Sequence, residues 1–169
     1  MMQPRDPGTQ RAHLLRAAGL AWLLVVGIDF FVNAGLLASL WEGPSSFLLS
    51  TADLFLRIPM GYAALLLWSV LVVWLVTRIH IERPRDGAVF GAELGILVTV
   101  AGMLGLASIS TISATIALAW ATTQIVEFAV VGYVGTLALR AGGTRRMTLA
   151  IIGLTLLLVA GGLIAQNLI

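Results

Sequence analysis

Three carboxylic acids, Asp29, Glu93 and Glu127, lie within long apolar stretches of the chain that contain no lysine, arginine or histidine. An ionised side chain at the centre of a bilayer costs about 3 kcal/mol or more, so such a group faces other helices, finds a partner or carries a proton. The three acids are therefore the candidate functional residues. The chemistry that they suggest is the binding of protons or cations.

Amide side chains accompany the two deepest acids. Asn33 follows Asp29 by one helical turn, and Gln124 precedes Glu127 by three residues, so each amide shares a helix face with its acid. At about 1.5 Å per residue, Asp29 and Glu127 are both about 18 Å from the arginine-bearing ends of their stretches, whereas Glu93 is only about 8 Å deep. We predict a midplane site of Asp29, Asn33, Gln124 and Glu127, with Glu93 on an approach from the cytoplasm.

The two deep acids favour proton-linked binding, although other roles are open. Two carboxyl groups that meet in an apolar site do not both ionise readily, so a shared proton is the simplest species. An arriving cation could release that proton, and Trp22, Trp68 and Trp120 could offer it aromatic faces, although Trp22 and Trp41 fit interfacial anchors at least as well. Alternatively, neutral acids could only hold helices together through hydrogen bonds worth about 1 kcal/mol or less, or they could pair with a cation of a partner subunit.

The composition excludes several classes of protein. Of the residues, 59% are hydrophobic and 11% charged, with a mean hydropathy of +1.00, whereas a soluble domain has roughly one quarter charged residues. All ten basic residues are arginines spread over loops and tails, which does not suggest nucleic-acid binding. Cysteine is absent, and we find no nucleophile elbow, zinc-protease or phosphate-loop motif. We therefore expect no cofactor or metal and rank enzyme activity last, although an intramembrane aspartyl enzyme would also use two acids such as Asp29 and Glu127.

Five stretches are long and apolar enough to cross a bilayer, which requires about 20 residues. The uncharged segment 108–113 separates the third from the fourth, and we expect a tight turn of an antiparallel hairpin there. The sequence predicts an all-α, polytopic integral membrane bundle that forms one domain over residues 1–169. Its predicted spans are Ala17–Leu40, Pro59–Thr77, Ala88–Ala107, Ala114–Leu139 and Met147–Leu168.

The arginines predict the orientation of these spans. Nine of the ten lie before the first span, between the second and third, or between the fourth and fifth. The positive-inside rule then gives an N-in, C-out topology, and we expect the inner (plasma) membrane of a bacterium. The exception is Arg57, which follows Asp53 by one turn and is expected to pair with it, or to form an outer gate, on a short interfacial helix over residues 45–57. Pro59 is expected to begin the next span.

Glycines predict where helices touch. Gly87, Gly91 and Gly95 recur every four residues at the start of the third span. Small residues at this spacing let helix backbones approach closely. We therefore expect the third span to be central in the bundle.

Two functions remain in view. The leading hypothesis is a small transporter or ligand-binding protein of the lipid bilayer that couples a small cationic or amphiphilic ligand to proton occupancy of the acids. Its alternative is a non-catalytic assembly subunit, in which the acids are helix-packing groups and the chain acts as a homo-oligomer or with a partner membrane subunit.

Overall fold

The computed structural model of the chain describes residues 7–42, 49 and 51–168, and the regular structure within them is entirely helical. Five of the helical segments are long and apolar enough to cross a membrane, the first of them combining α1 and η1. The predicted all-α architecture with five such helices is thus confirmed, and it indicates a multi-pass membrane protein. The elements are α1 (Pro7–Asp29), η1 (Phe30–Leu36), α2 (Ala38–Glu42), α3 (Thr51–Arg78), α4 (Pro84–Ile109), α5 (Ala114–Ala141) and α6 (Arg145–Gln166).

Side-chain caps and glycine explain several helix ends. α4 ends at Ile109, and the hydroxyl of Ser113 caps α5 by accepting a hydrogen bond from the backbone N–H of Ile116. At the other end of α5, Gly142 adopts the left-handed conformation (φ 63°) that glycine tolerates best. Thr144 caps α6 in the same way as Ser113 caps α5. The end of α4 at Ile109 and the start of α5 after Ser113 confirm the predicted turn between the third and fourth spans.

The predicted boundary at Pro59 is wrong. α3 begins at Thr51 and continues through Pro59 without a break. A proline inside a helix removes one backbone hydrogen bond, but such residues are tolerated in membrane helices because the freed groups find other partners. The second half of the predicted interfacial helix, residues 51–57, forms the first turns of α3, whereas residues 45–48 and 50 lie outside the described part of the chain.

The first span also differs from its prediction. Instead of continuing as an α-helix to Leu40, the chain becomes a π-helix at Phe30 and leaves it after Leu36. This wider segment packs against α6, where a Cβ atom on Gly35 would come within 3.0 Å of the Cα atom of Gly162. Phe31 contacts the same part of α6. Hydrophobic periodicity does not reveal this change, because both kinds of helix would be apolar here.

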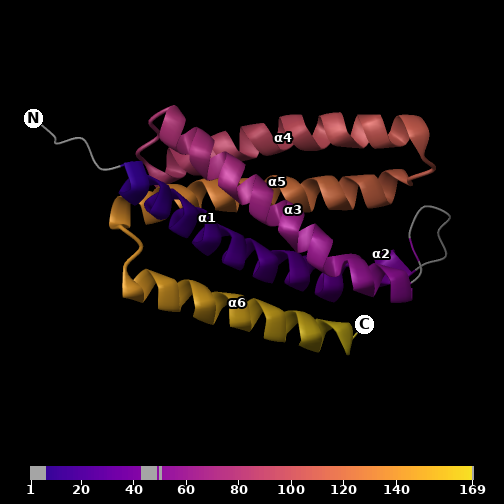
Figure 1. The fold of residues 1–169 in the computed structure, drawn as a ribbon. Coiled ribbons are helices and arrows are strands. Elements are labelled where there is room, and N and C mark those ends of the chain that lie inside the picture. Colours follow the sequence, from indigo (N-terminus) through magenta and orange to yellow (C-terminus); the bar gives the residue numbers. More distant parts are fainter. Residues whose placement is uncertain (1–6, 43–48, 50, 169) are drawn as a thin grey trace, which may run out of the picture.

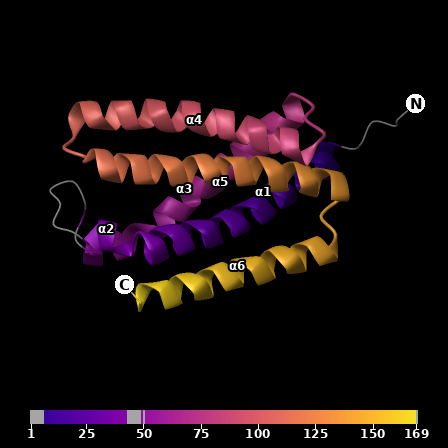
Figure 2. The same ribbon diagram turned by 180° about the vertical axis from the view of Figure 1, so that it is seen from behind.

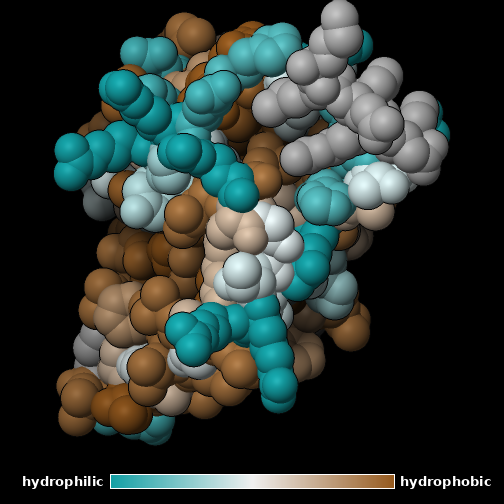
Figure 3. Space-filling model, turned by 90° about the vertical axis from the view of Figure 1, so that its left-hand side faces the viewer, coloured by the Kyte–Doolittle hydropathy of each residue, from teal (hydrophilic) through white to brown (hydrophobic). Residues whose placement is uncertain are grey.

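The helices form a bundle with two distinct edges. In Figures 1 and 2, α4 runs along one edge and α6 along the other, with α1, α3 and α5 between them. The start of α1, the α3–α4 connection and the α5–α6 connection lie at one end, and the end of α6 lies at the other. We call the first of these the arginine-bearing end, because Arg78, Arg83 and Arg140 flank its connections. Figure 3 shows hydrophilic side chains gathered over this end, with hydrophobic ones between and behind them.

Tight packing is concentrated in the half nearest the arginine-bearing end. The buried core joins residues 17–25 of α1, 72–76 of α3 and 128–138 of α5. Toward the other end α3 crosses the bundle diagonally (Figure 1), and every residue from Asp53 to Gly61 is exposed. The bundle is therefore closed in one half and looser in the other.

The glycines of α4 do bring two helices together, but they do not make α4 central. A Cβ atom on Gly91 would overlap the carbonyl oxygen of Phe128, and one on Gly132 would overlap that of Gly87. These contacts are all with α5, and α4 lies at the edge of the bundle. The central helices are α1, which packs against α3, α5 and α6, and α5, which packs against α1, α3 and α4. Ala18 and Ala21 of α1 are fully buried and let the neighbouring helices approach.

We expect Gly132→Ala to lower the free energy of unfolding in detergent by about 1–3 kcal/mol, because the added methyl group would force α4 away from α5. Its matched control is Gly102→Ala, at a helical position where a Cβ atom would meet nothing within 4 Å. That change should leave stability the same or raise it by up to about 1 kcal/mol. Thermal unfolding followed by circular dichroism compares the two, and equal stability of both variants would contradict the close α4–α5 contact.

Candidate functional site

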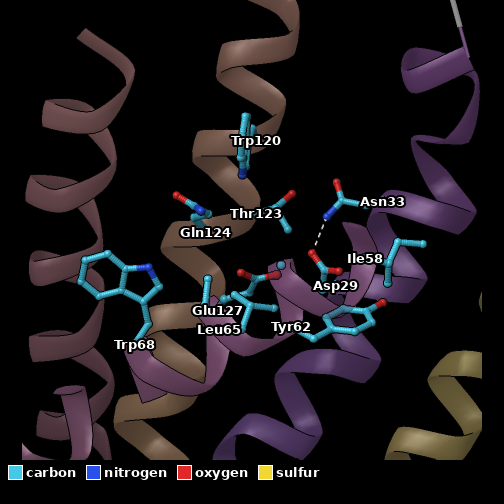
Figure 4. Close-up of a pocket in the computed structure, with 12 residues that line it drawn as sticks. Asp29, Asn33, Ile58, Tyr62, Leu65, Trp68, Trp120, Thr123, Gln124 and Glu127 are labelled. Atoms are coloured by element: carbon cyan, nitrogen blue, oxygen red, sulfur yellow. Dashed lines mark hydrogen bonds between the residues drawn. The ribbon is translucent and has the colours of Figure 1, made fainter. Parts of the chain in front are cut away.

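A cavity of about 280 Å³ lies between α1–η1, α3 and α5, in the looser half of the bundle (Figure 4). α1 and η1 contribute one acid and one amide, α3 contributes mainly apolar and aromatic side chains, and α5 contributes polar ones. Its lining residues are Asp29, Asn33, Ile58, Gly61, Tyr62, Ala64, Leu65, Trp68, Trp120, Thr123, Gln124 and Glu127. The structure thus brings the four predicted midplane residues to one cavity.

Two acids from different helices face each other across this cavity. Asp29 is the last residue of α1, and Glu127 lies in the middle of α5. Their carboxyl groups point toward one another in Figure 4 and are close enough to interact electrostatically. Glu127 is only 2% exposed. Two carboxyl groups this close in an apolar site do not both ionise readily.

Asn33 orients the Asp29 side of the pair. Its Nδ2 atom donates a hydrogen bond of 2.7 Å to Oδ1 of Asp29 (Figure 4). The directions of both side chains depend on the change from α-helix to π-helix, since Asp29 ends α1 and Asn33 belongs to η1. π-helical segments occur frequently at functional sites. Here the segment presents Asn33 to the cavity while Phe31 and Gly35 pack against α6.

The site contains oxygen acceptors that no donor satisfies. Within the described part of the chain, Oδ1 of Asn33 and Oε1 of Glu127 are buried and have no hydrogen-bond partner. An unsatisfied buried acceptor costs about 1–3 kcal/mol. Among the described residues that line the cavity there is no lysine, arginine or histidine. The cavity is therefore rich in acceptors and lacks a resident positive charge from these residues.

Aromatic rings form other parts of its wall, and neighbours hold them in place. Trp68 packs on Phe128 with ring centroids 5.4 Å apart, and Trp120 makes an edge-to-face contact with Trp41 at 6.4 Å. The Tyr62 hydroxyl group is close enough to both acids to interact with them electrostatically. Aromatic faces attract cations through the ring quadrupole.

Trp22 has a different position from the one predicted. It is not among the lining residues, and its Nε1 atom donates a hydrogen bond of 2.9 Å to the backbone carbonyl of Tyr62. Trp22 therefore joins α1 to α3 without lining the cavity. Its hydrogen bond helps to fix the backbone of α3 at Tyr62, which does line the cavity.

Gln124 is linked to the neighbouring helix. Its Oε1 atom accepts a hydrogen bond of 3.4 Å from the hydroxyl group of Thr99, which is buried on α4. Sequence reasoning missed Thr99, although the same depth count would have placed it about one turn from the level of Gln124. It also missed Tyr62, whose only signal was a polar aromatic residue a few residues beyond Pro59.

The remaining predicted residues lie outside the cavity. Glu93 is exposed on α4, beyond α5, so the structure does not bring it to the acid pair. Asp53 and Arg57 are exposed on the first turns of α3 and are not lining residues either, although the adjacent Ile58 is. The predicted approach through Glu93 is therefore not formed, because α5 separates α4 from the cavity.

Comparison with known proteins gives no assignment: no family model, curated protein or solved structure matches this chain. Within the residues that the structure describes, no group of three or more histidine, cysteine or acidic side chains is placed to hold a metal ion. The arguments about function therefore depend on the geometry of the cavity and on its two acids.

We expect the acid pair to hold one proton at neutral pH, because two carboxyl groups this close in an apolar site do not both ionise readily. Infrared spectra of the protein in liposomes should then show a protonated-carboxyl stretch that weakens in Asp29→Asn and in Glu127→Gln. Glu93→Gln is the matched control, because it makes the same change outside the cavity. A band that is equally strong in all three variants would show that the proton is held elsewhere.

Proposed function

We propose that this membrane protein binds a small organic cation in the cavity and that binding releases a proton from the Asp29–Glu127 pair. The observation that carries the proposal is the meeting of two acids from different helices in one cavity with aromatic walls. A proton and a cation are alternative ways to neutralise such a pair. Occupancy by one therefore opposes occupancy by the other.

The charge balance of the cavity favours a cation over an anion or a neutral ligand. Glu127 is almost completely buried, and an unpaired charge there would be costly. A ligand cation would provide the positive charge that the described lining residues lack. The aromatic rings of Trp68, Trp120 and Tyr62 can contact an apolar or cationic part of the ligand through their faces, without a hydrogen bond to it.

The size and position of the cavity limit the ligand. Its volume of about 280 Å³ lies at the lower end of small-molecule sites, which span about 300–1,000 Å³. By the positive-inside rule the closed, arginine-bearing half faces the cytoplasm of a bacterium, so the cavity belongs to the outer half of the inner membrane. A transporter with this site would exchange the cation for a proton, and the packed half would have to open during the cycle.

One observation favours a second function, that of an assembly subunit. Glu93 is an exposed acid within the apolar part of α4, on a face that carries Val89 and Leu97. An intramembrane acid pairs with a cation where one is present at its depth. If the chain is an assembly subunit, a membrane protein with such a cation should be recovered with the wild type and lost with Glu93→Gln.

Isothermal titration calorimetry of the detergent-purified protein tests cation binding. The probes are phenethylammonium and its N,N,N-trimethyl analogue, with uncharged 2-phenylethanol as the ligand control. We expect saturable binding of at least one cation and at least about tenfold weaker binding after Glu127→Gln, because that change removes one negative charge from the pair. Affinity should rise with pH while the amine stays charged, by up to about tenfold per pH unit where one proton leaves per cation bound.

Two protein controls make this result interpretable. Asp29→Asn removes the other charge, so the proposal does not depend on the folding of a single variant, and circular dichroism checks the helix content of both. Glu93→Gln changes an acid outside the cavity and should bind like the wild type. The proposal fails if neither cation binds at any pH, or if folded Asp29→Asn and Glu127→Gln both bind as tightly as the wild type.

A further inference from the structure

From the unsatisfied oxygen atoms, we infer that the cavity selects a primary ammonium group with a short apolar or aromatic tail over a quaternary ammonium group. This inference rests on the proposed function, because it assumes that a cation enters the cavity. It goes further by naming the chemical class of that cation. The hydrogen bonds around the two acids run in directions that leave acceptors without donors.

The Asn33 amide leaves an acceptor free. When the pair has released its proton, Asp29 can only accept hydrogen bonds, so the Nδ2 atom is the one that faces it across the 2.7 Å contact. That orientation leaves Oδ1 of Asn33 as the other end of the amide. This oxygen is buried and has no partner in the described structure.

Glu127 leaves a second acceptor free, and two nearby hydroxyl groups donate elsewhere. The hydroxyl group of Thr123, one turn earlier on α5, donates to the backbone carbonyl of Ala119 at 3.0 Å. The hydroxyl group of Thr99 donates to Gln124 instead. Oε1 of Glu127 is therefore an acceptor without a donor on a side chain that is 98% buried.

A primary ammonium group supplies what both oxygens need. It has three N–H donors and one positive charge, whereas the described residues around the cavity leave two acceptors without a donor, Oε1 of Glu127 and Oδ1 of Asn33. A quaternary ammonium group supplies the charge but no donor, and it would leave the buried acceptors unsatisfied. Sites built to hydrogen-bond a ligand reject analogues that lack the donor far more strongly than sites that recognise shape alone.

The rest of the wall fits the tail of such an amine. Ile58, Gly61, Ala64 and Leu65 give α3 an apolar surface along the cavity, and Trp68 extends it. This surface faces the polar side chains of α5. A ligand with its ammonium group at the acid pair would place its tail against α3.

The test is a calorimetric series on the wild-type protein at one pH: phenethylammonium and its N-methyl, N,N-dimethyl and N,N,N-trimethyl analogues. Affinity should fall as N–H donors are removed, with a total loss of at least about 30-fold between the first and the last. Because methylation also adds bulk, α,α-dimethylphenethylammonium is the matched ligand control. It is crowded beside the nitrogen but keeps three donors, so it should bind more tightly than the trimethyl analogue.

Asn33→Ala tests the role of the amide. It should weaken binding of phenethylammonium but change binding of the trimethyl analogue little, so that the ratio of the two affinities falls. Equal weakening of both ligands would overturn the role of the Asn33 oxygen. If the trimethyl analogue binds as tightly as phenethylammonium to the wild type, and Glu127→Gln weakens both, selection for a primary amine fails while the proposed function stands. If no member of the series binds, the proposed function itself fails.

Discussion

The interaction on which the rest of the site depends is the approach of Asp29 to Glu127 between α1 and α5. In a bundle of apolar helices, two carboxyl groups cannot be satisfied by bulk water, so each must find a proton, a donor or a cation within the protein. The Asn33 amide satisfies part of this requirement for Asp29. Two acceptors at this cavity, Oδ1 of Asn33 and Oε1 of Glu127, remain without a partner in the described structure.

Packing at the arginine-bearing end makes that approach possible. Small residues let helices lie close together there. The buried alanines of α1 allow α3, α5 and α6 to approach it, and the glycines of α4 allow α4 to approach α5. Because α1 and α5 are fixed over residues 17–25 and 128–138, their acids are held at the boundary between the closed half and the looser half. α3 contributes Ser69 and residues 72–76 to the closed half. Its preceding part, residues 58–68, provides one wall of the cavity.

Much of this arrangement could be predicted from the sequence, and what failed has physical reasons. Hydropathy and length identify all five spans, and a depth count places Asp29 level with Glu127. The count gives depth but not direction around the helix, so it could not show that Glu93 faces away from the bundle. Glycine spacing correctly indicated a close contact for α4. The spacing could not show that α5 alone packs against these glycines. The alanines of α1 offer an equally good surface for close packing, so the sequence did not show which helix lies centrally.

The π-helix is the feature that the sequence concealed most completely, and it connects the site to the far edge of the bundle. The segment from Phe30 to Leu36 has the cavity on one side, through Asn33, and α6 on the other, where Gly35 meets Gly162. The hydroxyl group of Thr155 on α6 donates to the backbone carbonyl of Leu23, which ties α6 to α1 just before this segment. The orientation of the Asn33 amide therefore depends on a helix that does not line the cavity. That orientation leaves Oδ1 of Asn33 without a partner in the described structure, so the packing of α6 bears on the hydrogen-bonding character of a cavity that it does not line.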